Sequence, residues 1–262
     1  MLSSTRDHTR FGIIGAPVKG SMSPRLFRAA YGGKYAYDLI EEDDFDKAWA
    51  RFLAGYDGIN ITAPFKALAA AAADIRSDEV GRIGAANLAV KTPDGVKAYN
   101  TDYAGVVRAL RPALKGGEKQ ALVVGCGGAG RAAAAAAADS CLNVTLVNRT
   151  MEKALAMAAE KALWKGVETD VMPLERLAEA VRKADVIIYT IPFGIPELEK
   201  VSREDWKGRI LLEANYKTPV LRDCGAEYIS GRSWLLHQAD AGYSLFTGES
   251  PDFSAMLAET EK

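Results

Sequence analysis

The sequence contains few cysteines and histidines and no excess of charge of either sign. Its 262 residues include three cysteines and two histidines, and the formal net charge is −1. Cys126, Cys141 and Cys224 form no C-x-x-C pair and are odd in number, so we expect reduced thiols rather than a disulfide framework or a zinc site. A nearly neutral chain has no field that attracts nucleic acid or an anionic membrane, so we expect neither as a partner.

Long apolar runs are also absent. No stretch approaches the roughly 20 apolar residues that a membrane-spanning helix needs. Residues 1–10 are polar and lack the apolar core of a secretory signal. We therefore expect a cytoplasmic protein. The length of the chain allows two domains of ordinary size, each with its own core.

A glycine-rich turn lies between an expected strand and an expected helix near the middle of the chain. Residues 121–124 are apolar and residues 132–138 are all alanine, which favours a buried strand followed by a helix. The glycines between them have the G-x-G-x-x-G spacing that brings a backbone close to a pyrophosphate at a helix N-terminus. A second apolar stretch, residues 143–147, follows at the distance expected of a β-α-β unit. The predicted dinucleotide site comprises Gly125, Gly127, Gly128, Ala129 and Gly130.

The residues after the second strand distinguish between the two nicotinamide dinucleotides. An NAD site usually has Asp or Glu about 20 residues beyond the glycines, where it accepts a hydrogen bond from the ribose 2′-hydroxyl. Here Asn148, Arg149 and Thr150 follow the strand, Lys153 comes shortly after, and no carboxylate stands where it would repel a phosphate. We predict that these residues bind the phosphate of NADP. The alternative is that Arg149 is a solvated cation at a strand end.

Strand and helix patterns alternate along most of the chain, which predicts an α/β protein. After the glycine turn, strand patterns at residues 167–171, 185–190 and 209–216 alternate with a helix pattern at residues 174–183. This alternation predicts a doubly wound parallel sheet of the Rossmann type for residues 104–232.

The first 103 residues show the same alternation and contain a lysine at an unusual place. A strand pattern at residues 58–61 is followed by Thr62 to Lys66 and an alanine-rich helix, which puts Lys66 in the first helical turn. A lysine there faces the positive end of the helix dipole, at a cost of up to about 1 kcal/mol. Because helices normally have Asp or Glu in that place, the mismatch indicates a functional role for Lys66.

Six segments of the chain, in order, resemble shikimate dehydrogenases. They are Gly15 to Pro24, Asn60 to Lys66, Gly84 to Asn87, Asn100 to Gly105, the glycine turn with Asn148 to Thr150, and Gln238 to Gly248. Together they extend over almost the whole chain, so the resemblance is far more specific than the glycine spacing alone. It implies reversible NADPH-dependent reduction of 3-dehydroshikimate to shikimate. It also implies an N-terminal α/β substrate-binding domain, residues 1–103 with 233–262 packing back, that faces the NADP domain across a cleft.

The resemblance implies a catalytic pair and a set of substrate-binding side chains. Reduction of a ketone by a hydride needs a proton donor at the carbonyl oxygen, and Lys66 with Asp102 would supply it. Gly194, in the turn after the strand at 185–190, is expected to lie against the cofactor. The substrate would be bound by hydroxyl and amide groups, and the expected residues are Ser21, Ser23, Asn60, Thr62, Asn87, Tyr216 and Gln238.

These residues also have plainer interpretations. Asp102 could simply cap a helix, and Ser23 could be only the N-cap before Pro24. Each amide or hydroxyl side chain alone is more often a satisfied turn residue, and Tyr216 could be an aromatic residue at a strand end. His237 has no partner at ligand spacing, so we expect a structural role for it and no metal site.

The chain departs from the family pattern at three places. Gly20 stands where the family usually has His, and Tyr189 to Ile195 differ from the usual Asn-Ala-Thr-Pro-x-Gly-Met. Glu213 to Pro219 differ from Asp-x-x-Tyr-x-Pro. We expect these changes to tune affinity rather than abolish the chemistry.

Other functions are compatible with the same sequence. Two alternatives are a quinate/shikimate dehydrogenase, or a paralogue acting on a related ring hydroxy acid, and a non-catalytic ligand sensor. The paired serines Ser21 and Ser23 argue against a related folate-type dehydrogenase. We expect a monomer or a homodimer.

Overall fold

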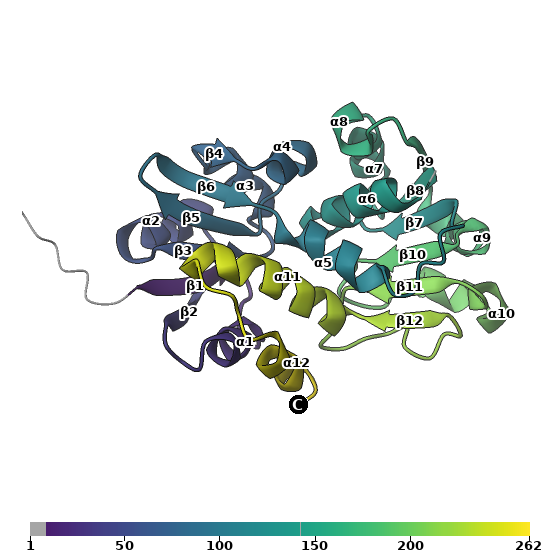
Figure 1. Cartoon of the computed structure of the whole chain (residues 1–262). Helices are drawn as coiled ribbons and strands as arrows, with labels where there is room; N and C mark the ends of the chain where they lie inside the picture. The colour runs from purple at the N-terminus through teal and green to yellow at the C-terminus, as the bar shows by residue number, and fades with distance from the viewer. Residues whose placement is uncertain (1–8, 142) are drawn as a thin grey trace, which may run out of the picture. The chain divides into compact units, whose positions relative to one another are not determined.

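The computed structural model describes residues 9–141 and 143–262, and the polar segment 1–8 used above to argue against a secretory signal lies outside them. The chain forms two compact units (Figure 1). The first unit comprises residues 9–101 and 238–262, and the second comprises residues 102–237. The units divide at 101/102 and 237/238, where the sequence suggested 103/104 and 232/233. The predicted α/β class is confirmed, with one six-stranded sheet in each unit.

The first unit contains a mixed sheet in the order β2-β1-β3-β5-β6-β4. Strand β5 runs antiparallel to both of its neighbours, whereas the other pairs are parallel. Its elements are β1 (Arg10–Gly15), α1 (Ser23–Ala30), β2 (Ala36–Glu41), α2 (Phe45–Gly55), β3 (Gly58–Ile61), α3 (Lys66–Ala72), β4 (Ile75–Arg76), α4 (Asp78–Ile83), β5 (Leu88–Thr92), β6 (Gly95–Tyr99) and α12 (Phe253–Thr260).

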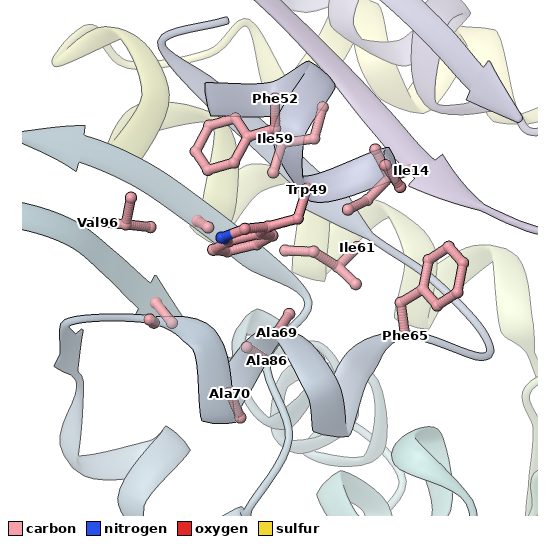
Figure 2. Packing of buried hydrophobic residues seen from close by; sticks show 14 of the residues in the cluster. Ile14, Trp49, Phe52, Ile59, Ile61, Phe65, Ala69, Ala70, Ala86 and Val96 are labelled. Atoms are coloured by element: carbon pink, nitrogen blue, oxygen red, sulfur yellow. The ribbon is translucent and has the colours of Figure 1, made fainter. Parts of the chain in front are cut away.

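Aromatic residues of α2 form the centre of one core cluster in this unit. Figure 2 shows Trp49 in the middle of the cluster, with Phe52 and Ile59 on one side and Ala69 and Ala70 on the other. The Trp49 and Phe52 rings meet nearly edge to face, with centroids 5.0 Å apart. Burying one such side chain contributes about 1.5–3 kcal/mol, so this packing fixes the strands and the start of α3 that carry the polar residues described below.

The second unit contains a sheet whose strand pairs are all parallel, in the order β12-β11-β10-β7-β8-β9. Numbered within the unit this is 6-5-4-1-2-3, the order of a Rossmann sheet. Helix α11 begins here and continues into the first unit. The elements are α5 (Thr101–Leu110), β7 (Gln120–Val124), α6 (Gly128–Ser140), β8 (Asn143–Val147), α7 (Met151–Ala158), α8 (Lys161–Trp164), β9 (Glu168–Met172), η1 (Leu174–Arg176), α9 (Leu177–Lys183), β10 (Val186–Tyr189), η2 (Pro196–Lys200), α10 (Arg203–Trp206), β11 (Ile210–Glu213), β12 (Glu227–Ser230) and α11 (Gly231–Thr247).

The alanine run forms the buried helix that the sequence predicted. All seven alanines of residues 132–138 are buried in α6. Small side chains let this helix approach strands β7 and β8 closely, which places the N-terminus of α6 directly after the glycine turn. Within the described residues, no helix combines the length and the hydropathy needed to cross a membrane.

Candidate functional site

Two serine hydroxyls meet at the start of α1 in the first unit. Ser21 Oγ donates to Ser23 Oγ over 3.2 Å and accepts from the Ser23 backbone N–H, also over 3.2 Å. The prediction that Ser23 caps this helix is wrong: the N-cap is Met22, and the Ser23 side chain makes no capping bond. The hydroxyl of Ser21 instead satisfies the free N–H of Ser23. Both hydroxyls therefore lie at the positive end of the α1 dipole, where an anion is favoured.

Three of the predicted amide side chains form one buried polar network in the same unit. Asn87 Nδ2 donates to Gln238 Oε1 over 3.2 Å, and Asn60 Nδ2 donates to the Asn87 carbonyl over 3.3 Å. Thr101, which the sequence did not suggest, joins the network because Asn87 Nδ2 donates to its hydroxyl over 3.0 Å. The exposed fractions of these four residues are between 3% and 8%. Their positions are therefore fixed by tertiary packing and not by local turns.

Thr62 lies apart from these hydrogen bonds but close to the end of β1. Its backbone N–H donates to the Ile14 carbonyl over 3.0 Å. A Cβ on Gly15 would come within 2.4 Å of Thr62 Cγ2. The absence of a side chain at Gly15 is thus what allows the segment after β3 to pass beside β1.

Two adjacent loop residues, Ala86 and Asn87, hold the backbone at or beside the two predicted catalytic residues. Lys66 is the first residue of α3, and its carbonyl accepts from the Ala86 N–H over 2.8 Å. Thr101, directly before Asp102, donates its N–H to Asn87 Oδ1 over 2.7 Å. Asp102 is buried and lies in the first turn of α5, which begins at Thr101, so Asp102 is not the N-cap.

The glycine turn of the second unit is closed by contacts that only glycine permits. A Cβ on Gly130 would lie 1.9 Å from the Gly125 carbonyl oxygen, and Gly125 itself has φ +103°. By contrast, a Cβ on Gly127 would meet nothing within 4 Å. Gly127 is the N-cap of α6, and Gly128 is its first residue, followed by Ala129 and Gly130. The turn follows β7, which pairs with both β8 and β10 at the point where the strand order reverses.

The segment after β8 contacts this turn through one side chain and leaves a cation exposed. Asn148 Oδ1 accepts from the Cys126 N–H over 3.1 Å, and Asn148 Nδ2 donates to the Thr150 carbonyl over 2.8 Å. Arg149 is exposed and makes no hydrogen bond or ion pair with any residue that the structure describes. Burial raises the pKa of the Cys126 thiol to about 11, so the thiol adds no negative charge to the turn.

Lys153 follows this segment as an exposed residue of α7, with its backbone N–H donating to the Thr150 carbonyl over 3.2 Å. Thr150 is the N-cap of α7. The predicted cationic and hydroxyl groups after β8 are therefore arranged around the start of a helix.

The departure from the family pattern at Tyr189 to Ile195 has defined partners in the second unit. The Tyr189 hydroxyl donates to the Phe193 carbonyl over 2.8 Å, and Thr190 Oγ1 donates to the Val124 carbonyl over 2.9 Å. The first bond fixes the turn that leads to Gly194, and the second holds the end of β10 against the end of β7. The residues Tyr189, Thr190 and Ile191, which replace the usual Asn-Ala-Thr, are thus part of a hydrogen-bonded turn.

Tyr216 lies beyond the end of β11, in a loop that a buried carboxylate organises. Glu213 is fully buried and accepts from the N–H groups of Val220 and Leu221, over 2.7 and 3.2 Å, and from the Tyr228 hydroxyl over 3.1 Å. Burial, reinforced by this carboxylate, raises the pKa of Tyr228 to about 12, so the phenol remains a donor. Three donors thus satisfy the buried carboxyl group and position the loop that carries Tyr216.

A hollow of about 720 Å³ lies in the first unit against α1 and β2. Arg28, Lys34 and Tyr37 are among the described residues that line it, and none of the predicted site residues does. Among residues 9–141 and 143–262, no three His, Cys, Asp or Glu side chains are grouped so as to hold a metal ion.

Two family models match the chain, one in each unit. Residues 13–89 match the shikimate dehydrogenase substrate-binding domain, and residues 109–204 match shikimate / quinate 5-dehydrogenase. A shikimate dehydrogenase (NADP(+)) of Halobacterium salinarum is 36% identical, over 95% of this chain and 97% of the relative.

Solved structures agree with the family models. The crystal structure of Mycobacterium tuberculosis shikimate dehydrogenase matches with a TM-score of 0.80 and 32% identity, over 97% of this chain and 98% of that one. Shikimate 5-dehydrogenase of Thermus thermophilus, in complex with NADP(H) and shikimate, matches with a TM-score of 0.80 and 26% identity over the same shares.

The strand order and the glycine turn define the second unit as a Rossmann-type dinucleotide-binding unit. With both family models matched and relatives above 30% identity over nearly its full length, the chain belongs to the shikimate dehydrogenase family.

Proposed function

We propose that the protein catalyses the reversible NADPH-dependent reduction of 3-dehydroshikimate to shikimate. The Halobacterium salinarum relative described above bears the name of this NADP(+)-dependent dehydrogenase. The observation that carries the proposal is the hydrogen bonding around the loop at Ala86 and Asn87, which holds the backbones of Lys66 and of Thr101, the residue before Asp102.

In this proposal Lys66 and Asp102 handle the proton. Lys66 donates a proton to the developing alkoxide during reduction and takes it back during oxidation, while Asp102 orients the lysine. A lysine at the first position of α3 opposes the helix dipole, and a catalytic role gives a reason for it to stand there. Ser21 and Ser23 bind the substrate carboxylate, since their hydroxyls lie at the start of α1.

The remaining proposed substrate contacts are polar groups suited to ring hydroxyls. Asn60, Asn87 and Gln238 belong to the buried network of the first unit, and Thr62 and Tyr216 complete the set. Amides both donate and accept hydrogen bonds, which matches hydroxyl groups that do the same.

The second unit has the features that a bound NADP requires. The glycines leave the start of α6 without side-chain cover, so backbone N–H groups there can bind a pyrophosphate. Arg149, Thr150 and Lys153 would hold the 2′-phosphate, Asn148 would position them, and Gly194 would pack against the cofactor. Bound NADPH supplies the hydride. Residues 148–150, directly after β8, include no carboxylate, which favours NADP over NAD.

Quinate is the second candidate substrate, because one matching family model includes quinate dehydrogenases. We place the protein in the cytoplasm, as a monomer or a homodimer. The test is a spectrophotometric assay of shikimate oxidation with NADP and with NAD, repeated with quinate. We expect the largest kcat/KM for shikimate with NADP. Larger values for quinate or NAD would reassign the substrate or the cofactor, and no oxidation of either acid would favour a ligand sensor.

A further inference from the structure

A tyrosine outside the expected set contacts the proposed substrate residues of the first unit. Tyr37 lies on β2, and its hydroxyl is 2.7 Å from Asn60 Oδ1. Its ring packs against Phe27, with centroids 4.8 Å apart, and meets the Tyr243 ring at an interplanar angle of 60°, with centroids 6.4 Å apart. The Ser23 hydroxyl is close enough to the phenol to lower the pKa of Tyr37, although burial has the larger and opposite effect. The phenol therefore stands between Ser23 and Asn60.

The hydrogen bonds of Asn60 determine which way its amide faces. The Asn87 carbonyl can only accept, so the Asn60 atom that meets it at 3.3 Å must be Nδ2. Oδ1 then faces Tyr37, and because Oδ1 can only accept, the phenol must donate. Burial keeps the pKa of Tyr37 well above its ordinary value, so this donor keeps its proton. The second hydrogen of Asn60 Nδ2 has no acceptor among the residues that the structure describes.

We propose that Tyr37 is a positioning residue for the substrate, because it locks the Asn60 amide with its N–H toward the ligand. Asn60 then meets the ligand as a donor, which selects an oxygen that can accept, such as a ring hydroxyl. Tyr37 itself acts through Asn60 and takes no part in the transfer of the hydride or the proton. This inference rests on the proposed function, since it assigns Asn60 to the substrate.

The principal test is Tyr37→Phe, which removes the donor and keeps the ring. We expect kcat/KM for shikimate to fall about tenfold, the effect of losing one buried hydrogen bond. The loss should appear mainly in the KM for shikimate, while the KM for NADP and the pH profile of kcat stay unchanged. Isothermal titration calorimetry with shikimate should show the same tenfold loss of affinity without turnover.

A matched control is available in the same aromatic cluster. Tyr35 also packs against Phe27, with centroids 6.3 Å apart, but its hydroxyl donates to Glu249 and not to the polar network. Tyr35→Phe should leave the KM for shikimate unchanged. An equal loss in both variants, or an equal rise in the KM for NADP, would show a general packing effect and overturn the proposal.

The role of Asn60 as intermediary is tested by combining variants. In an Asn60→Ala background, Tyr37→Phe should cause no further loss, because the residue through which it acts is gone. Asn60→Asp keeps an acceptor for Tyr37 but replaces the donor, so it should lose as much shikimate affinity as Asn60→Ala. This variant decides the matter if Tyr37→Phe does not fold. Full activity of Asn60→Asp, or equal Tyr37→Phe losses in both backgrounds, would contradict the proposal.

These outcomes separate the inference from the proposed function. If the wild-type protein binds shikimate but does not oxidise it, the proposed function is wrong, and the calorimetric comparison still tests Tyr37. If the wild type oxidises shikimate and Tyr37→Phe binds it equally well, only the inference on Tyr37 is wrong. A wild type that neither binds nor oxidises shikimate contradicts both.

Discussion

The two units offer different kinds of group to a ligand, although each is built on a six-stranded sheet. In the second unit the candidate site is mostly backbone, because glycines clear the start of α6 and the strand order reverses beside it. In the first unit the candidate site is made of side chains. One residue, Asn87, forms hydrogen bonds with Thr101, Asn60 and Gln238. A backbone site depends on the absence of side chains, whereas a side-chain site depends on their mutual hydrogen bonds.

This difference leads to different responses to substitution. Adding a single carbon at Gly130, where the glycine turn is closed, should destabilise the protein and weaken cofactor binding together. Removing a polar group from the first unit should weaken the binding or turnover of the substrate and leave the affinity for the cofactor unchanged. The four predictions below test that separation, beginning with the largest effect.

Lys66→Ala should lower kcat for shikimate oxidation by about two to four orders of magnitude, the range for loss of a general acid–base group. NADP affinity should not change, because Lys66 belongs to the first unit. Steady-state kinetics and fluorescence titration with NADPH measure the two quantities. Lys47 is a suitable control, since it lies exposed in the first turn of α2, and Lys47→Ala should keep full activity. Turnover of Lys66→Ala near that of the wild type would refute the assignment.

Gly130→Ala should destabilise the second unit and weaken NADP binding together. The new Cβ would lie 1.9 Å from the Gly125 carbonyl, so the turn must open, at a cost of about 3 kcal/mol. Gly127→Ala is the matched comparison, because its Cβ meets no protein atom within 4 Å and its φ is −80°. It should keep the wild-type melting temperature and weaken only NADP binding.

Thermal unfolding with and without NADP separates these two effects. If Gly127→Ala bound NADP as tightly as the wild type, the pyrophosphate would not lie at this turn. If Gly130→Ala melted like the wild type, the turn could not be as tight as described.

The same contrast explains how much the sequence predicted. The glycine turn, the alanine helix and the parallel sheet follow from local patterns, since period, spacing and glycine positions are all visible within short segments. The short helix α4 could also have been predicted from local signals, because Ser77 caps its start and Gly84, with φ +69°, ends it. The short strands β4 and β12 carry no such signal, and their pairing is decided by neighbours distant in the sequence.

The polar network of the first unit could be predicted only in part. The family resemblance suggested Asn60, Asn87 and Gln238, but nothing local indicates Thr101 or Tyr37. Tyr37 on β2 contacts Asn60 on β3, and β1 lies between these two strands in the sheet, so the contact exists only after folding. The capping error at Ser23 has a local cause, because the chain starts the helix one residue earlier than the proline suggested and uses Ser21 instead.

Arg149→Gln tests whether the segment after β8 distinguishes the two dinucleotides. A charge-assisted hydrogen bond to a phosphate contributes about 1.5–3 kcal/mol, so NADP affinity should fall about 10- to 100-fold. NAD affinity should not change, and it serves as the internal control. The experiment is a titration of each cofactor into both proteins. Equal losses for NADP and NAD would assign Arg149 to a part of the cofactor that the two share.

Glu41→Gln should have the smallest effect, and the effect should depend on pH. Glu41 ends β2 and accepts from the N–H groups of Lys19 and Val18, over 3.1 and 3.2 Å, in the loop before Ser21. These backbone donors hold the pKa of Glu41 below its ordinary value. The carboxylate therefore stabilises the loop fully at any pH above the pKa of Glu41 in the unfolded chain, near 4.3. This stabilisation is lost as the pH falls through the lower pKa that Glu41 has in the folded protein.

Calorimetric titration of shikimate into the wild type and Glu41→Gln would measure this contribution. At neutral pH the variant should bind about threefold more weakly, a small effect because the group is solvent-screened. The difference should vanish below the folded pKa of Glu41, where the wild-type side chain is also neutral, and protonation of the ligand cancels in the comparison. A difference that persisted at low pH would mean that the amide alters the loop by its shape and not by its charge. The serine site would then depend on packing, as the glycine turn does, and the contrast between the two units would be weaker than the hydrogen bonds suggest.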